Sequence, residues 1–121
     1  MEIVLYHNPS CSKSRATLAL LQELGVEPEV VAYLDTPPSA EELIHIAAKL
    51  NVSVSGMIRF KGTLTVELGL KQDDDRSDVE WATWLEENPE LLERPIAVMG
   101  ERAVFGRPPD NVRLLVKEMN T

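Results

Sequence analysis

The sequence predicts an α/β fold with a mixed sheet and helices on both faces, in which a βαβ unit and a ββα unit flank a helical insertion. Two observations favour this class. Apolar runs at residues 3–6 and 30–33 are separated by a helical pattern, and short apolar runs at residues 95–99 and 103–105 precede a last helical pattern. The 121 residues suit one ordinary core, so we expect residues 1–121 to form a single domain.

The first unit begins with a continuous apolar run at residues 3–6, which is typical of a strand buried on both faces. Apolar residues then recur at helical spacing over residues 12–24, and Gly25 supplies the helix end. The second strand, residues 30–33, is followed by a Thr-Pro-Pro break. Because a helical crossover joins the two strands, we expect them to be parallel.

The middle of the chain is predicted to be helical. Ser-x-x-Glu pairs at 39–42 and 77–80 have the spacing of a capping box. The first opens a helix that carries Leu43, Ile44, Ala47 and Leu50, and the second opens a helix over residues 78–87. Ser53 is a candidate cap for a short helix that ends near residue 59.

The C-terminal unit is predicted to be a hairpin followed by a helix. A turn around Gly100 joins the strands at residues 95–99 and 103–105, and the helix covers residues 110–119. This order, with a cysteine after the first strand and a proline at the start of the third, resembles the thioredoxin fold with an inserted helical region. In that fold the proline is cis, so we expect a cis Arg94-Pro95 bond.

Composition excludes several functions. The formal charge of −8, with no stripe of Lys and Arg, argues against a nucleic-acid ligand. No stretch approaches the roughly 20 apolar residues that span a bilayer, and no secretory pattern is seen, so we expect a cytoplasmic protein without a membrane partner. Zinc-ligand spacing and a glycine-rich phosphate loop are lacking, and the acidic run at 73–75 lacks the spaced ligands of a calcium loop, so no metal site is predicted.

Cys11 is the one cysteine in the chain, and it stands where the first strand meets the first helix. N–H groups and the helix dipole at that position favour the thiolate. Lowering the pKa by ~2 units takes roughly 2.7 kcal/mol, of which a helix end supplies up to ~2 kcal/mol. The alternative is a small buried hydrophobic residue, but the polar neighbours of Cys11 favour a reactive thiol. Because it is alone, its redox chemistry needs a second thiol from another molecule.

Two neighbours are candidates for stabilising the thiolate. Ser14 stands where the second cysteine of a Cys-x-x-Cys motif would be, and its hydroxyl can donate to Cys11, although an ordinary first-turn serine explains it equally well. His7, if protonated, would stabilise the anion, whereas a histidine at a strand end is as often only a hydrogen-bonded polar residue.

Four segments resemble the glutaredoxin-linked arsenate reductase family: residues 6–18 (YHNPSCSKSRATL), 33–38 (YLDTPP), 67–70 (ELGL) and 94–96 (RPI). The resemblance implies a thioredoxin-like fold and a nucleophilic cysteine, which falls on Cys11. It also implies three arginines that bind an oxyanion, and these fall on Arg59, Arg94 and Arg107.

Arginine suits this role because its planar fork donates two parallel hydrogen bonds to an oxyanion and stays charged. The alternative for scattered arginines is a solvated surface. Arg94 and Arg107 directly precede prolines, and a rigid backbone makes a purely surface role less suitable for them. A phosphatase-like reductase is excluded, because it needs Cys-x5-Arg and the spacing from Cys11 to Arg15 is Cys-x3-Arg.

The resemblance implies that the Cys11 thiolate attacks arsenate, that glutathione forms a mixed adduct on arsenic, and that glutaredoxin resolves it with release of arsenite. Glutathione is then a cosubstrate, and no bound cofactor is expected. The family also includes glutathione-dependent thiol reductases, and its relatives include Spx-type regulators that bind RNA polymerase. The redox-sensing regulators carry Cys-x-x-Cys, so Ser14 disfavours that alternative.

Overall fold

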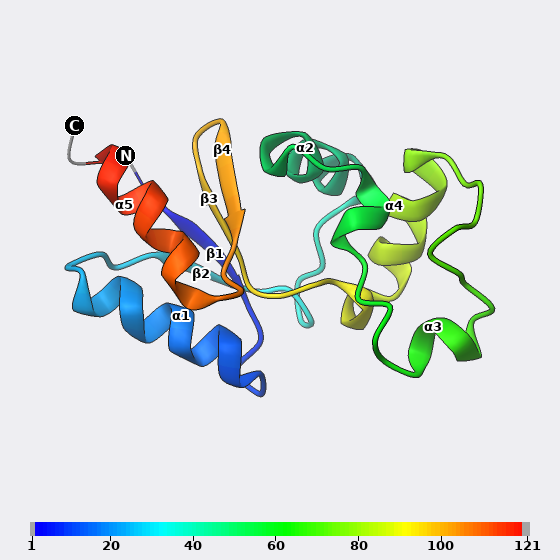
Figure 1. The fold of residues 1–121 in the computed structure, drawn as a ribbon, viewed down its shortest axis with the longest axis horizontal. Coiled ribbons are helices and arrows are strands. Elements are labelled where there is room, and N and C mark those ends of the chain that lie inside the picture. The colour runs from blue at the N-terminus through cyan, green and yellow to red at the C-terminus, as the bar shows by residue number, and fades with distance from the viewer. Residues whose placement is uncertain (1, 120–121) are drawn as a thin grey trace. The chain divides into compact units, whose positions relative to one another are not determined.

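A four-stranded mixed sheet in the order β2-β1-β3-β4 organises the first of two units into which the chain divides. The computed structural model describes residues 2–119. The first unit joins the chain up to Thr36 with the chain from Arg94 onward, and the second unit covers Pro37–Glu93 (Figure 1). The four strands of the sheet, all in the first unit, are β1 (Val4–His7), β2 (Glu29–Ala32), β3 (Ile96–Met99) and β4 (Arg102–Phe105).

The strand directions agree with the predicted βαβ and hairpin units. β1 and β2 are parallel, with Leu5 opposite Val30, whereas β3 is antiparallel to both β1 and β4. Leu5 also faces Ala97 of β3. All four residues of β3 are buried, so both faces of this central strand are covered. The predicted mixed α/β fold is confirmed, with strand limits shifted by about one residue.

Helices α1 (Ser12–Glu23) and α5 (Arg113–Met119) pack against the sheet and close the core of the first unit (Figure 1). The buried side chains of this core come from both helices, from β1 and β3, and from the turns beside them. They are Ile3, Leu5, Leu21, Ala97, Met99, Val112, Leu115 and Val116. Burying one such aliphatic side chain contributes about 1.5–3 kcal/mol to the stability of the fold. This cluster therefore holds α1 against β1, the strand that precedes it in the chain.

Gly25 ends α1 as predicted. It has a φ of +83°, its N–H donates to the carbonyl of Gln22, and the N–H of Val26 donates to the carbonyl of Leu21. This pair of bonds is a Schellman motif, which requires a left-handed residue and therefore favours glycine.

The last helix begins later than the predicted range of residues 110–119. The chain first forms a 3-10 turn, Pro109–Val112, and becomes α-helical only at Arg113.

The second unit is helical. Its elements are α2 (Ala40–Leu50), a 3-10 turn (Val54–Met57), α3 (Leu64–Glu67), α4 (Asp78–Glu87) and a second 3-10 turn (Pro89–Leu91). The two longer helices, α2 and α4, pack against each other. Trp81 of α4 is almost fully buried, and its ring stands nearly perpendicular to that of Phe60, with 5.9 Å between the ring centroids. The helix α3 was not predicted, because a single turn carries too few residues to show a period.

The three predicted caps differ in detail. Ser77 and Glu80 form a complete capping box at α4. Ser39 accepts the N–H of Glu42 at 3.1 Å, but its hydroxyl donates to the Glu42 carboxylate at 3.4 Å. Ser53 precedes the 3-10 turn without a side-chain cap bond, so the short helix there is tighter than expected and ends at Met57.

Two X-Pro bonds of the first unit are cis. The Arg94-Pro95 bond was predicted to be cis, and Arg107-Pro108 was not.

Among residues 2–119, no helix has both the length and the apolar character needed to cross a bilayer.

Gly106, which follows β4, has no room for a side chain. A Cβ built there would lie 2.6 Å from Cγ of Pro95, 2.7 Å from Oγ1 of Thr17 and 2.9 Å from Cγ2 of Thr17. The loop after β4 therefore approaches α1 and the start of β3 as closely as backbone can.

We expect Gly106→Ala to lower the free energy of unfolding by about 1–3 kcal/mol, because the added methyl group forces the loop away from Thr17 and Pro95. Urea denaturation measures the change. The matched control is Gly62→Ala, where a Cβ meets nothing within 4 Å, and its effect should stay within about 0.5 kcal/mol. Equal unfolding midpoints for the two variants would contradict the expected crowding.

Candidate active site

The loop between β1 and α1 gives Cys11 a fixed place at the start of the helix. Cys11 is the N-cap residue of α1 and has an extended backbone. Its N–H donates to the carbonyl of Asn8 at 3.0 Å, and the side chain of Asn8 accepts from the N–H of Ser10 at 3.0 Å. Arg15 closes the loop from the helix side by donating from Nη1 to the carbonyl of Pro9 at 2.9 Å. The half-buried sulfur is thus held over the first turn of α1.

The surroundings of Cys11 favour its thiolate. Burial raises the pKa of the thiol, but the backbone N–H of Ser14, the side-chain hydrogen bond and charge of Arg94, and the backbone N–H of Lys13 outweigh it, so the net pKa is lowered. No conventional cap hydrogen bond joins the sulfur to the first turn, so the two N–H groups act as dipoles that face an anion. Local groups therefore activate the nucleophile in spite of partial burial.

Ser14 links the end of β1 to the first turn of α1. Its hydroxyl oxygen lies 2.7 Å from Nδ1 of His7 and accepts the N–H of Asn8 at 3.0 Å. Ser14 is fully buried and His7 is nearly so. The Ser14 hydroxyl therefore contacts His7, and the Ser14 N–H faces Cys11, whereas the predicted hydrogen bond from the Ser14 hydroxyl to the thiolate stays a prediction.

The environment of His7 disfavours its protonated ring. Burial, and then the positive charge of Arg15, lower its pKa from the ordinary value of about 6.5. In the neutral ring, Nδ1 either accepts from or donates to the Ser14 hydroxyl, according to its tautomer. The contact orients Ser14, and the predicted charge effect of a protonated His7 on the thiolate stays a prediction.

The sheet brings Arg94 and Arg107 together. Arg94 precedes β3 and Arg107 follows β4 by two residues, and Ile96 pairs with Phe105 in the antiparallel ladder. Nη1 of Arg107 donates to the carbonyl of Arg94 at 3.1 Å. Because Tyr6 at the end of β1 also pairs with Ile96, the cysteine loop leaves the sheet at this same edge. Two predicted oxyanion ligands and the nucleophile thus share one edge of the sheet.

Arg59 belongs to the second unit, just after the 3-10 turn Val54–Met57. Its N–H donates to the carbonyl of Leu91 at 2.7 Å, and the side chain is half-buried. Its part in oxyanion binding stays a prediction from the family resemblance.

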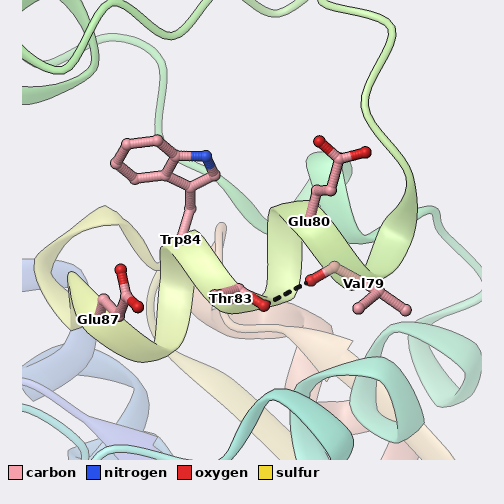
Figure 2. Close-up of a pocket in the computed structure, with 5 residues that line it drawn as sticks. All are labelled: Val79, Glu80, Thr83, Trp84 and Glu87. Carbon is pink, nitrogen blue, oxygen red and sulfur yellow. Dashed lines mark hydrogen bonds between the residues drawn. The ribbon is translucent and has the colours of Figure 1, made fainter.

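A shallow hollow lies on α4 in the second unit (Figure 2). It is lined by Val79, Glu80, Thr83, Trp84 and Glu87. Two of these side chains are carboxylates and none is a cation or nucleophile suited to an oxyanion. Within the described part of the chain, no group of three or more His, Cys, Asp and Glu side chains is placed to hold a metal ion.

We expect Cys11 to ionise below the pH of an ordinary thiol and Arg94→Gln to raise its apparent pKa by about one unit. The physical reason is that a hydrogen bond to a charged group contributes about 1.5–3 kcal/mol, and one pKa unit corresponds to about 1.4 kcal/mol. Thiolate absorbance against pH measures the apparent pKa of Cys11 directly, because no other cysteine contributes. Arg113→Gln is the control, since Arg113 pairs with Asp110 on the surface. An unchanged midpoint in Arg94→Gln would refute the assigned contact.

We expect the ring of His7 to titrate below pH 6.5. The unfolded state then takes up the proton first on acidification, so this residue makes the free energy of unfolding fall as the pH drops from about 6.5 through the folded pKa. Arg15→Gln should raise the pKa of His7 only in part, because burial is the larger cause. Proton NMR of the histidine rings, with His45→Gln to assign them, provides the measurement; a midpoint above 6.5 would show that the burial argument fails.

Comparison with known proteins supports one family. The ArsC family model matches residues 6–115. The arsenate reductase of Neisseria meningitidis serogroup A is 46% identical over 116 residues, which cover 95% of this chain and 98% of that protein. YfgD of Escherichia coli K12, an uncharacterized protein, is 45% identical over 95% of this chain and 97% of its own length.

Among solved structures, the arsenate reductase from Vibrio cholerae superposes with a TM-score of 0.87 at 47% identity, covering 93% of this chain and 95% of that one. The residues that the family model matches, 6–115, include the cysteine loop and both strands of the hairpin. The chain therefore belongs to the ArsC family, whose arsenate reductases its sequence motifs resemble.

Proposed function

We propose that this protein is an arsenate reductase in which Cys11 is the nucleophile and glutathione and glutaredoxin supply the electrons. The observation that carries the proposal is the meeting of a thiol of lowered pKa with Arg94 and Arg107 at one edge of the sheet. Additional support comes from the arsenate reductase names of relatives that match nearly the whole chain.

The arrangement suits attack on a tetrahedral oxyanion. Thiolate sulfur is a strong nucleophile, and Arg94 already donates to it. Arginine guanidinium groups also donate to oxyanion oxygens and neutralise the charge that would otherwise repel the thiolate. Arg94 would therefore serve both partners of the reaction, and Arg107, tied to the Arg94 carbonyl, would extend the cationic surface. Arg59 is proposed as the third ligand.

The lone cysteine sets the source of electrons. Sulfur attack on arsenate forms an S–As bond and releases one arsenate oxygen as water after protonation. Reduction of As(V) to As(III) takes two electrons, which two external thiols provide as they become a disulfide. We assign these thiols to glutathione and glutaredoxin, so the sum is arsenate plus two thiols giving arsenite, a mixed disulfide and water. Cys11 is regenerated as the thiolate.

We expect arsenate-dependent oxidation of NADPH when the protein is combined with glutathione, glutaredoxin and glutathione reductase. Cys11→Ser should lose at least about 1,000-fold in rate, because a hydroxyl is a far weaker nucleophile than a thiolate at neutral pH. NADPH absorbance follows the reaction, and omission of glutaredoxin tests the reductant separately. Absence of arsenate-dependent turnover in the wild type would refute the proposed substrate.

The same assay distinguishes the two alternatives. A glutathione-dependent thiol reductase would consume NADPH with a glutathione mixed disulfide in place of arsenate, and this activity would also need Cys11. An Spx-type regulator would show neither activity and would instead bind RNA polymerase in a pull-down. Arg94 is informative here, since an oxyanion substrate requires it for binding, whereas a neutral disulfide requires it only for the pKa of Cys11.

A further inference from the structure

The loop that carries Arg107 is held by side chains at three successive carbonyl groups. Nδ2 of Asn111 donates to the carbonyls of Phe105 and Arg107, at 3.0 Å and 3.2 Å. Between them, the carbonyl of Gly106 faces Oγ1 of Thr17 at 3.1 Å. The N–H of Gly106 donates to the carbonyl of Pro95 at 2.8 Å. These bonds fix the backbone of the loop at three successive residues.

Thr17 is the contact from α1 to this loop. It is fully buried and lies in the helix that begins just after Cys11. Its hydroxyl oxygen is 2.8 Å from the carbonyl of Lys13, one turn back, and 3.1 Å from that of Gly106. A hydroxyl has one proton, so the two carbonyls share it. A bond to the preceding turn is ordinary for threonine in a helix, whereas the bond to Gly106 joins two segments distant in sequence.

Close packing makes this contact rigid. A Cβ on Gly106 would come within 3 Å of both branches of Thr17 and of the ring of Pro95. The Thr17 side chain therefore sets the separation between α1 and the Gly106 segment, which in turn is hydrogen-bonded to Pro95. The Gly106 segment leads into Arg107, and the Pro95 segment begins directly after Arg94, so a shift of either segment moves a guanidinium group relative to Cys11.

We propose that Thr17 is a positioning residue of this active site. Its hydroxyl and methyl groups hold the backbone of Gly106 against α1, and Gly106 holds Pro95 through its N–H, so that Arg94 keeps its place beside the thiolate and Arg107 its place beside Arg94. Thr17 touches neither the sulfur nor the substrate and acts through the two arginines. The part of this proposal that concerns oxyanion binding rests on the proposed function, and the part that concerns ionisation of Cys11 does not.

Two substitutions separate the hydroxyl from the shape of the side chain. Thr17→Val keeps the shape of the side chain and removes its hydroxyl, so the buried carbonyl of Gly106 loses this hydrogen-bond donor. Thr17→Ser keeps the donor. Thr83→Val is the matched control, because Thr83 on α4 makes the same bond to the preceding turn, 2.8 Å to the carbonyl of Val79, and is exposed. Each variant is titrated by thiolate absorbance and assayed with arsenate.

We expect Thr17→Val to raise the apparent pKa of Cys11 by about half a unit or more, which is a loss of about threefold in the thiolate equilibrium. The KM for arsenate should rise several-fold. Thr17→Ser should restore both values toward the wild type, and Thr83→Val should change neither. If Thr17→Val does not fold, Thr17→Ala removes the same donor without added bulk and carries the same expectation.

Destabilisation of Thr17→Val with an unchanged Cys11 pKa and unchanged KM would overturn the proposal and leave Thr17 a packing residue. An unchanged pKa and KM in Thr17→Val with full stability would overturn it as well. If Thr17→Val raises the pKa of Cys11 but the wild type does not reduce arsenate, the positioning role would be supported and the proposed substrate refuted. The titration needs no substrate, so the two failures are distinguishable.

Discussion

The antiparallel register of β3 against both of its neighbours is the constraint on which the site depends. Tyr6 pairs with Ile96, and Ile96 pairs with Phe105, so the end of β1, the start of β3 and the end of β4 lie at one edge of the sheet. The residues just beyond these positions form the site, although the chain separates them widely. A slip of one residue in either ladder would move every side chain of β3 to the opposite face of the sheet. Because both faces of this strand are buried, such a slip would force the core to repack on both sides.

The charge distribution is compatible with the proposed anion site in a protein of formal charge −8. The second unit has twelve Asp and Glu against five Lys and Arg, a charge of −7, whereas the first unit has eight against seven, a charge of −1. The nucleophile thus belongs to the nearly neutral part. Screening limits the effect of exposed charges beyond about 8 Å, so Arg94 and the N–H groups of the first helical turn dominate at Cys11. Net charge argues against nucleic acid as a ligand but leaves room for a small oxyanion.

Local patterns predicted most of the fold because caps, breakers and apolar periods act over a few residues. Ser77 with Glu80, and Gly25, behave as their spacing predicts. The place of Cys11 at a helix start also follows from sequence, since a strand pattern and a helix pattern meet there. Other features depend on distances between remote segments, which no local pattern contains. The contact of Thr17 with Gly106 is one of these, and the only sequence sign was a glycine beside an arginine and two prolines.

Ser14 shows how one position can serve a lone thiol in two ways. Its N–H helps to lower the pKa of Cys11, and any residue other than proline would supply that group. Its hydroxyl instead joins His7 and the N–H of Asn8, which ties the end of β1 to the helix. A cysteine at this position would offer a resolving thiol but a weaker hydrogen-bond partner for His7. With serine, the cysteine loop is held by two strong bonds and no internal disulfide competes for Cys11, so the sulfur stays available to an oxyanion and to thiols from outside.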